Sequence, residues 1–223
     1  MPDLTPIVTI DGPSGSGKGS ISRRVAQHLG WHMLDSGAIY RVLALQVLNA
    51  DCAFNDVDKI ESLAAMLPVE FSDTSAYLAG VDVTHEIRSE ACGDVASKIS
   101  VLPTVRDALL ARQRLFAQLP GLVADGRDMG TVVFPDAFLK IYLDATVEER
   151  AKRRFLQLKD SGYNVTLQDL VADIIQRDVR DRTRVVAPLR PAPDAIIIDS
   201  TELSIEVVFK KIVDLAQQRL SNF

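Results

Sequence analysis

Residues 12–20 read GPSGSGKGS, a glycine-rich stretch whose composition suits the binding of phosphate groups. Gly12, Gly17 and Lys18 satisfy the phosphate-loop pattern G-x-x-x-x-G-K-[ST], in which the lysine reaches the β- and γ-phosphates of a nucleotide. Glycine permits backbone angles that turn successive N–H groups toward an anion. A turn that merely connects two elements is the alternative. The pattern predicts a nucleoside triphosphate site made by Gly12, Pro13, Ser14, Gly15, Ser16, Gly17, Lys18, Gly19 and Ser20.

Position 19 departs from this pattern, because it is Gly and the expected hydroxyl falls at Ser20. One step along a helix rotates a side chain by about 100°, so Ser20 cannot simply replace a hydroxyl at position 19. The departure indicates that Mg²⁺ is held mostly by phosphates and water, with weak ligation by the protein. A glycine here also predicts that a second group approaches the loop closely.

Arginine is concentrated in one part of the chain. The sequence has 17 Arg and 8 Lys, and eight of the arginines fall within residues 150–190. Arg177, Arg180, Asp181 and Arg184 stand at i, i+3, i+4 and i+7, so on a helix they share one face. Guanidinium groups suit bidentate recognition of phosphate, and this grouping predicts a small, highly phosphorylated ligand. A solvated helix with surface ion pairs is the alternative.

These residues need a scaffold, and strands that alternate with helices supply one. A β-branched strand at 6–10 runs directly into the glycine-rich loop, and apolar spacing predicts a helix at 18–30. Such alternation implies a parallel sheet covered on both faces, so we assign the chain to the α/β class. Further strands are expected at 122–125, 138–145 and 196–200, and further helices at 38–50, 56–67, before Pro103, and at 104–119, 147–159, 167–184 and 205–220.

The segment 69–84 breaks this alternation. Its two runs VEFSDT and AYLAGVDVT read as short antiparallel strands, with turns near Ser75 and Gly80. We therefore expect the part from about 56 to 100 to be an insertion near the ligand.

Helix starts are marked by polar caps. Asn55 is expected to cap the helix at 56–67, and either Asp35 or Ser36 the helix at 38–50. Thr146 and Glu149 have the spacing of a capping box.

Composition limits the classes of function. The chain has 223 residues, 47% of them hydrophobic, and a formal charge of −5, which fits one α/β domain and argues against nucleic acid as the main partner. No apolar run approaches the ~20 residues of a membrane span, and the N-terminus does not read as a signal peptide. Cys52 and Cys92 lack metal-ligand spacing, so we expect two buried thiols in a reducing cytoplasm.

Several longer stretches carry a family resemblance. The loop GKG followed by a hydroxyl residue resembles nucleoside monophosphate kinases, and LDSGAIYR, ADGRDMGTVVFPDA, RDVRDRTR and DSTELSIEVV narrow the resemblance to bacterial cytidylate kinases. Ser20 is a mild departure, because that family more often has Thr there. The resemblance implies a single kinase domain over 1–223 with a five-stranded parallel core. It also implies a monophosphate-binding insertion at about 56–100 and a short lid at about 155–166.

The resemblance assigns the donor side to the loop and to the helix before the lid. Lys18 and the loop amides bind ATP. Arg150 and Arg154 lie over the donor phosphates, where they would stabilise charge spreading in the transition state. Lys152 and Arg153 point elsewhere, toward solvent. The side chains implied at the transferred phosphoryl group are Lys18, Arg127, Arg150, Arg154 and Arg184.

The acceptor side is assigned by the same resemblance. Arg127, Arg41 and Arg184 face phosphate, while Arg177 and Asp181 contact the sugar. Phosphoryl transfer asks mainly for such positioning and charge neutralisation. The full acceptor set is Ser36, Tyr40, Arg41, Ser97, Arg106, Arg127, Asp128, Arg177, Asp181 and Arg184.

Asp128 resembles the carboxylate that meets the cytosine edge, with Ser97 and Arg106 as companions. Cytosine has a 4-amino donor beside the N3 and O2 acceptors, which suits this set, whereas uracil presents the reverse pattern. Two residues keep alternatives. Ser36 could serve the acceptor or cap a helix, and Asp125 could order magnesium-bound water or be a structural cap.

The implied reaction is transfer of the γ-phosphoryl group of MgATP to CMP or dCMP in pyrimidine nucleotide metabolism, by direct in-line displacement. Mg²⁺ is the expected cofactor, with Ser20 and Asp125 as its candidate protein contacts. We expect a cytoplasmic monomer with small-molecule substrates and no nucleic-acid or membrane partner. A kinase for another acceptor and a slowly hydrolysing nucleotide switch are the alternatives.

Overall fold

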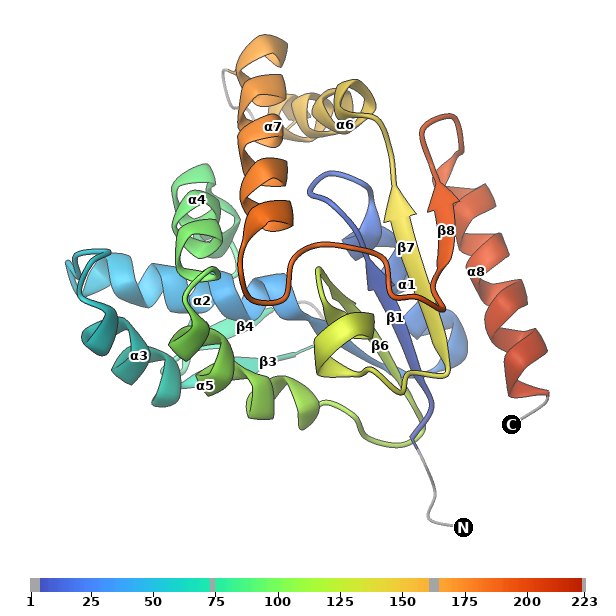
Figure 1. The fold of residues 1–223 in the computed structure, drawn as a ribbon, viewed down its shortest axis with the longest axis horizontal. Helices are drawn as coiled ribbons and strands as arrows, with labels where there is room; N and C mark the ends of the chain where they lie inside the picture. Colours follow the sequence, from blue (N-terminus) through green and yellow to red (C-terminus); the bar gives the residue numbers. More distant parts are fainter. Residues whose placement is uncertain (1–4, 73–74, 161–164, 222–223) are drawn as a thin grey trace. The chain divides into compact units, whose positions relative to one another are not determined.

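The computed structural model describes residues 5–72, 75–160 and 165–221 (Figure 1). The chain forms two compact units, and we describe each by itself. Unit 1 consists of Met1–Leu34 and Ala117–Phe223, and unit 2 is Asp35–Phe116.

Unit 1 is built on a parallel sheet, as the alternating pattern predicts. Among the described residues, five strands form it in the order β2-β6-β1-β7-β8, and β1 lies at the centre (Figure 1). β1 pairs in parallel with β6 and with β7, and β7 pairs in parallel with β8. The strands are β1 (Ile7–Asp11), β2 (His32–Asp35), β6 (Leu122–Gly126), β7 (Leu139–Asp144) and β8 (Ile196–Asp199).

Helices α1 and α8 close the core of unit 1 against this sheet. Val25 of α1 and Ile212 of α8 are fully buried, together with Ile10 and Ile141 of the strands. Trp31, the one tryptophan of the chain, lies against the backbone of Gly121, where an added Cβ would be 2.3 Å from its ring. The helical elements of unit 1 are α1 (Lys18–Leu29), η2 (Met129–Val133, a π-helical turn), α6 (Val147–Asp160), α7 (Leu167–Thr183) and α8 (Ile205–Leu220).

Helices α6 and α7 pack on each other through Ala151, Leu158, Leu170 and Ile174. α7 ends at Thr183, one residue before the expected end, and Arg184 is its C-cap with φ −59° and ψ 139°. Because φ of Arg184 is helical and its N–H still donates to Arg180 O (3.2 Å), its Cβ leaves from the same helical face as Arg177 and Asp181.

The capping box expected before α6 is half formed. The N–H of Glu149 donates to Thr146 Oγ1 (3.4 Å). The N–H of Thr146 donates to Thr201 Oγ1 (3.1 Å), and the Glu149 carboxylate pairs with Arg153. The Glu149 carboxylate, which would complete the box by accepting from the N–H of Thr146, therefore binds Arg153 instead.

Unit 2 holds helices and, among its described residues, one small antiparallel sheet in the order β3-β4-β5. Asp35 caps α2, since its carboxylate accepts from the N–H of Ala38, while Asp56, not Asn55, caps α3. The elements are α2 (Ser36–Asn49), α3 (Val57–Ala65), β3 (Val69–Phe71), β4 (Ala76–Leu78), β5 (Val81–Asp82), η1 (Glu86–Arg88), α4 (Glu90–Ile99) and α5 (Pro103–Arg114).

Cys52 and Cys92 are free and buried, as expected. In the part of the chain that the structure describes, no helix combines the length and the apolarity needed to cross a bilayer.

Candidate active site

The glycine-rich loop joins the end of β1 to the start of α1. Gly12 has φ 151°, and a Cβ there would lie 2.0 Å from the carbonyl oxygen of Leu143, so a side chain is excluded. Gly17 is the left-handed N-cap of α1 at φ 94°. The loop therefore leads into a helix N-terminus, whose unsatisfied N–H groups and dipole favour an anion.

Lys18 is buried at the base of this loop. Its Nζ donates to the carbonyl oxygen of Pro13 (2.7 Å) and to Ser16 Oγ (3.4 Å). Burial, followed by the charge of Arg127, lowers the pKa of Lys18 to about 7. An anion beside this ammonium group would favour its charged form.

Asp11 lies directly before the loop and fastens the turn that follows β6. Its two carboxylate oxygens accept from the N–H groups of Met129 and Gly130, each at 2.8 Å. Burial raises the pKa of Asp11 to about 6, against the lowering effect of these two hydrogen bonds. Asp11 therefore fixes the backbone of Met129 and Gly130, the two residues that follow Asp128.

The close approach predicted at Gly19 is confirmed. A Cβ at Gly19 would lie 3.3 Å from Oδ2 of Asp125, a tight contact. Asp125 lies in β6, and its carboxylate is beside the first turn of α1. A carboxylate thus occupies the space beside position 19, which explains why glycine stands there.

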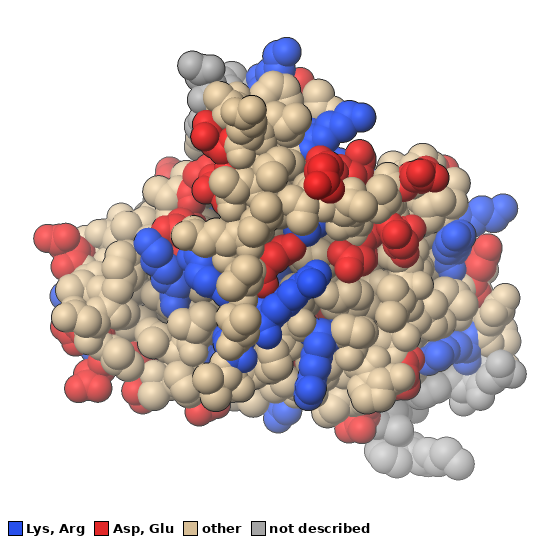
Figure 2. All heavy atoms as spheres, turned by 45° about the horizontal axis from the view of Figure 1, so that its top comes forward, with Lys and Arg blue, Asp and Glu red and all other residues tan. Residues whose placement is uncertain are grey.

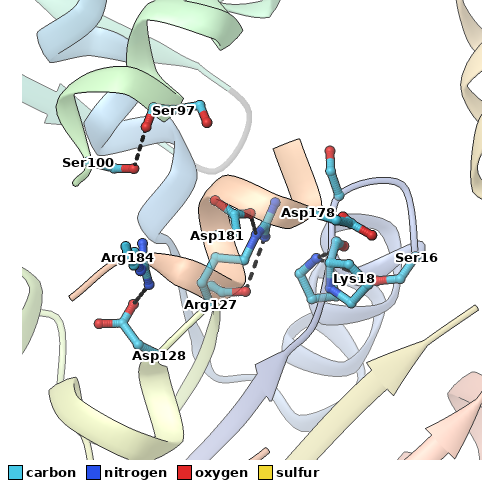
Figure 3. Close-up of polar contacts among 12 residues, drawn as sticks. Ser16, Lys18, Ser97, Ser100, Arg127, Asp128, Asp178, Asp181 and Arg184 are labelled. Carbon is cyan, nitrogen blue, oxygen red and sulfur yellow. Dashed lines mark hydrogen bonds and ion pairs between the residues drawn. The ribbon is translucent and has the colours of Figure 1, made fainter. Parts of the chain in front are cut away.

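Two arginine–carboxylate pairs, one buried and one partly buried, lie beyond β6 (Figure 3). Arg127 Nε donates to Asp181 Oδ2 at 2.9 Å. Burial alone would raise the pKa of Asp181, but the charges of Arg127 and Arg177 hold this pKa below its usual value. Arg184 Nη2 is 3.6 Å from Asp128 Oδ1, and its Nε donates to the carbonyl oxygen of Ala187. The structure therefore brings five predicted acceptor residues of unit 1 together.

Arg150 is deeply buried, with 1% of its surface exposed. All three of its guanidinium nitrogens donate to protein acceptors: Nε to Ala145 O, Nη1 to Ser14 O and Asp178, and Nη2 to Asp178. Arg154 is half-buried and donates to Gln157. Contact of either arginine with donor phosphate stays a prediction.

Arg153 does not point to solvent, so that expectation is wrong, whereas Lys152 is exposed as expected. The Arg153 guanidinium donates to Ser16 O (3.3 Å), to Ser200 O (2.6 Å) and to Ser200 Oγ (3.1 Å). It also pairs with Glu149 on its own helix. Arg153 therefore joins the loop to the segment that follows β8.

Unit 2 holds the other predicted acceptor residues. Arg106 Nη1 donates to Ser100 O (3.2 Å), and its guanidinium lies 5.9 Å from the Tyr40 ring centroid. Ser100 Oγ donates to Ser97 O (Figure 3). Ser97 Oγ is buried without a hydrogen-bond partner among the described residues, so this hydroxyl keeps its bonding capacity.

Arg41 is held by its own unit. Its Nη1 donates to Ile87 O (2.7 Å) and Ser89 O (3.3 Å), and a Cβ at Gly93 would lie 2.9 Å from Nη2. Ser36 begins α2 but does not cap it, so the helix-cap explanation for Ser36 is wrong.

A family model described as cytidylate kinase matches residues 8–218. The chain belongs to the cytidylate kinase family. A relative named cytidylate kinase from Aeromonas hydrophila is 52% identical, covering 100% of this chain and 98% of that protein. A cytidylate kinase from Shewanella denitrificans is 53% identical, covering 99% of this chain and 100% of that protein. A cytidylate kinase from Escherichia coli is 52% identical, covering 99% of this chain and 99% of that protein.

Three contacts in this member of the cytidylate kinase family were not predicted from its sequence. Asp11, Asp178 and Arg153 touch the loop or its support, yet only position marks them: Asp11 directly precedes Gly12, and Asp178 follows Arg177. Hydrogen bonds that join residues 28, 118 or 137 positions apart leave no local pattern.

Two further expectations concern the lid and the metal ion. Residues 161–164 of the expected lid lie outside the described residues, between the end of α6 at Asp160 and the start of α7 at Leu167. Among the residues that the structure describes, no group of three or more His, Cys, Asp or Glu could hold a metal ion.

Proposed function

We propose that this chain transfers the γ-phosphoryl group of ATP to CMP and dCMP, giving ADP and CDP or dCDP, as a step of pyrimidine nucleotide metabolism. The full-length match to the cytidylate kinase family carries the proposal. The buried lysine in a loop that opens a helix supports it, because this arrangement binds a nucleotide triphosphate. The proposed domain is single, with an insertion at about 56–100 and a lid at about 155–166.

The donor side would work by charge and by oriented N–H groups. Lys18 leaves Pro13 O and turns to the β- and γ-phosphates, and the amides of the loop bind the remaining oxygens. Arg154 neutralises charge that spreads in the transition state. Closure of the lid excludes water, which would otherwise hydrolyse ATP.

The acceptor side would need no general base, because the attacking phosphate oxygen is already an anion. Arg127, kept in place by Asp181, binds the acceptor phosphate together with Arg41 and Arg184. Arg177 and Asp181 contact the sugar.

The cytosine base would be recognised by polar side chains. Asp128, Ser97 and Arg106 match the donor and acceptor pattern of the cytosine edge. Ser36 and Tyr40 complete the acceptor set. The hydrogen-bonding capacity left on Ser97 Oγ supports its part in this set.

Mg²⁺ is the proposed cofactor, and the residues present fit it. Asp125 has a carboxylate oxygen beside Gly19 at the start of α1, and Ser20 is exposed one residue further. These groups would hold the ion through water, and the phosphates would supply its other ligands. When bound, Mg²⁺ neutralises phosphate charge.

We also propose a cytoplasmic monomer that acts on small molecules, without a nucleic-acid or membrane partner. Both acidic and basic side chains lie on the face drawn in Figure 2, and the formal charge of −5 supports the view that nucleic acid is not the main ligand.

The test is ADP formation from MgATP by the purified protein, with CMP, dCMP, UMP, AMP, GMP or no acceptor in parallel. We expect strong dependence on CMP and dCMP, with UMP far behind. Equal rates with all monophosphates would refute the acceptor, and acceptor-independent hydrolysis would favour a nucleotide switch.

Asp128→Asn tests whether Asp128 recognises the cytosine base of the acceptor. We expect kcat/KM for CMP to fall by about 10²-fold or more, since the carboxylate would otherwise accept from the 4-amino group. Asp136→Asn, which changes an exposed carboxylate of the same unit, is the matched control.

A further inference from the structure

A buried ion pair lies next to the glycine-rich loop, and its carboxylate, Asp178, has no part in the proposed chemistry. Arg150 of α6 and Asp178 of α7 form two hydrogen bonds, Nη1 to Oδ1 at 3.0 Å and Nη2 to Oδ2 at 2.5 Å. The side chain of Arg150 is 2% exposed and that of Asp178 11%. A two-pronged pair of this kind fixes the orientation of the guanidinium plane as well as its position.

The same guanidinium group holds a loop carbonyl. Arg150 Nη1 donates to Ser14 O at 3.0 Å, and Nε donates to Ala145 O at 2.9 Å. The loop approaches the helix closely, because a Cβ at Gly15 would lie 3.1 Å from the Cβ of Arg150. Arg150 therefore binds the loop at the carbonyl oxygen of Ser14, and Asp178 binds and orients Arg150.

Peptide planarity turns this contact into control of an N–H group. In a trans peptide the C=O of one residue and the N–H of the next point in opposite directions. When Ser14 O points to Arg150, the N–H of Gly15 points away from α6. Arg153 acts in the same way one step along, since it binds Ser16 O and so orients the N–H of Gly17.

Asp178 is placed one turn of α7 from Asp181. Asp181 holds Arg127, while Asp178 holds Arg150, so two buried carboxylates of one helix orient two arginines. Figure 3 shows both carboxylates on this helix, with Asp178 on the side of the loop that carries Ser16 and Lys18.

We propose that Asp178 is a positioning residue for the donor phosphates, which acts through Arg150 and Ser14 O on the N–H of Gly15. This inference rests on the proposed binding of ATP by the loop. It gives Arg150 a role through the backbone of the loop, in place of direct contact with phosphate. Loss of the carboxylate should weaken the binding of ATP without changing the affinity for CMP.

The test compares Asp178→Asn with wild type and with Asp173→Asn, which removes an exposed carboxylate from the same helix. We expect Asp178→Asn to raise the Kd of a non-hydrolysable ATP analogue, measured by calorimetry, about tenfold. KM for CMP should stay within about twofold. Asp178→Glu, which restores the charge, should recover part of the loss, and Asp173→Asn should match wild type.

A purely structural role would lower the free energy of unfolding and leave the Kd of the folded fraction unchanged, and that result would overturn the inference. If Asp178→Asn does not fold, Arg150→Lys replaces it, because lysine keeps the charge but cannot bind Asp178 and Ser14 O together. An unchanged Kd for Arg150→Lys would also overturn it. If wild type fails to phosphorylate CMP, the proposed function fails, while the comparison of ATP analogue affinities still tests Asp178.

Discussion

Replacing Asp11 by Asn removes the charge of a buried carboxylate and keeps its size. Asp11 accepts from the N–H groups of Met129 and Gly130, and burial raises its pKa from 3.8 to about 6. Because the folded-state pKa lies above the unfolded value, the folded protein binds more protons between these two values. The stability contributed by this group is full below pH 3.8 and is lost as the pH rises through 6, by about 3 kcal/mol in total.

The assay is urea unfolding of the nucleotide-free protein at several pH values between 4 and 7. The free energy of unfolding of wild type minus that of Asp11→Asn should fall by up to about 3 kcal/mol across this range. A constant offset of about 1–3 kcal/mol is expected in addition, because the amide nitrogen of Asn cannot accept one of the two N–H bonds. Asp136→Asn, at an exposed site, should show neither effect. A difference that does not vary with pH would refute the argument that burial controls Asp11.

Three further outcomes follow from the geometry. Gly12→Ala, whose Cβ would meet Leu143 O at 2.0 Å, should lower the free energy of unfolding by about 3 kcal/mol or more in urea titrations, and a loss below 1 kcal/mol would contradict the close approach. Gly93→Ala should displace the end of the flexible Arg41 side chain, and the gain of about 1 kcal/mol from replacing a helical glycine by alanine should offset most of this cost, so a loss above about 2 kcal/mol in the same assay would contradict the reasoning. ATP binding at pH 8 should take up about one proton, because phosphate favours the charged form of Lys18, whose pKa is about 7 in the free protein. Calorimetry in buffers of different ionisation enthalpy measures this uptake, Lys18→Met should lack it, and equal uptake by that variant would assign the proton elsewhere.

Local sequence patterns were sufficient for most of the fold. The β-branched run before the loop became β1, the apolar spacing of α1 was confirmed, and the segment at 69–84 formed antiparallel strands. These features depend on periodicity and on turn residues, which neighbouring positions determine. Asn55 was wrongly preferred to Asp56 because both are good caps and only the backbone geometry separates them.

The candidate site was predictable where a motif is contiguous and less so where a contact is long-range. The close approach of a second group to the glycine at 19 was predicted correctly, and the loop joins a strand to a helix as expected, while its binding of ATP stays a prediction. Arg153 was assigned to solvent because helical spacing says which face a residue occupies but not what covers that face. Its partners Ser16 and Ser200 come from distant parts of the chain.

The position of Trp31 makes the chain its own reporter of folding. The single indole lies in unit 1, packed on the backbone of Gly121, whereas unit 2 has tyrosines and no tryptophan. Tryptophan emission therefore follows the melting of unit 1 alone, while far-ultraviolet circular dichroism follows the helices of both units. Coincident transitions would mean that the two units unfold as one cooperative body, and separated transitions would give each unit its own melting temperature.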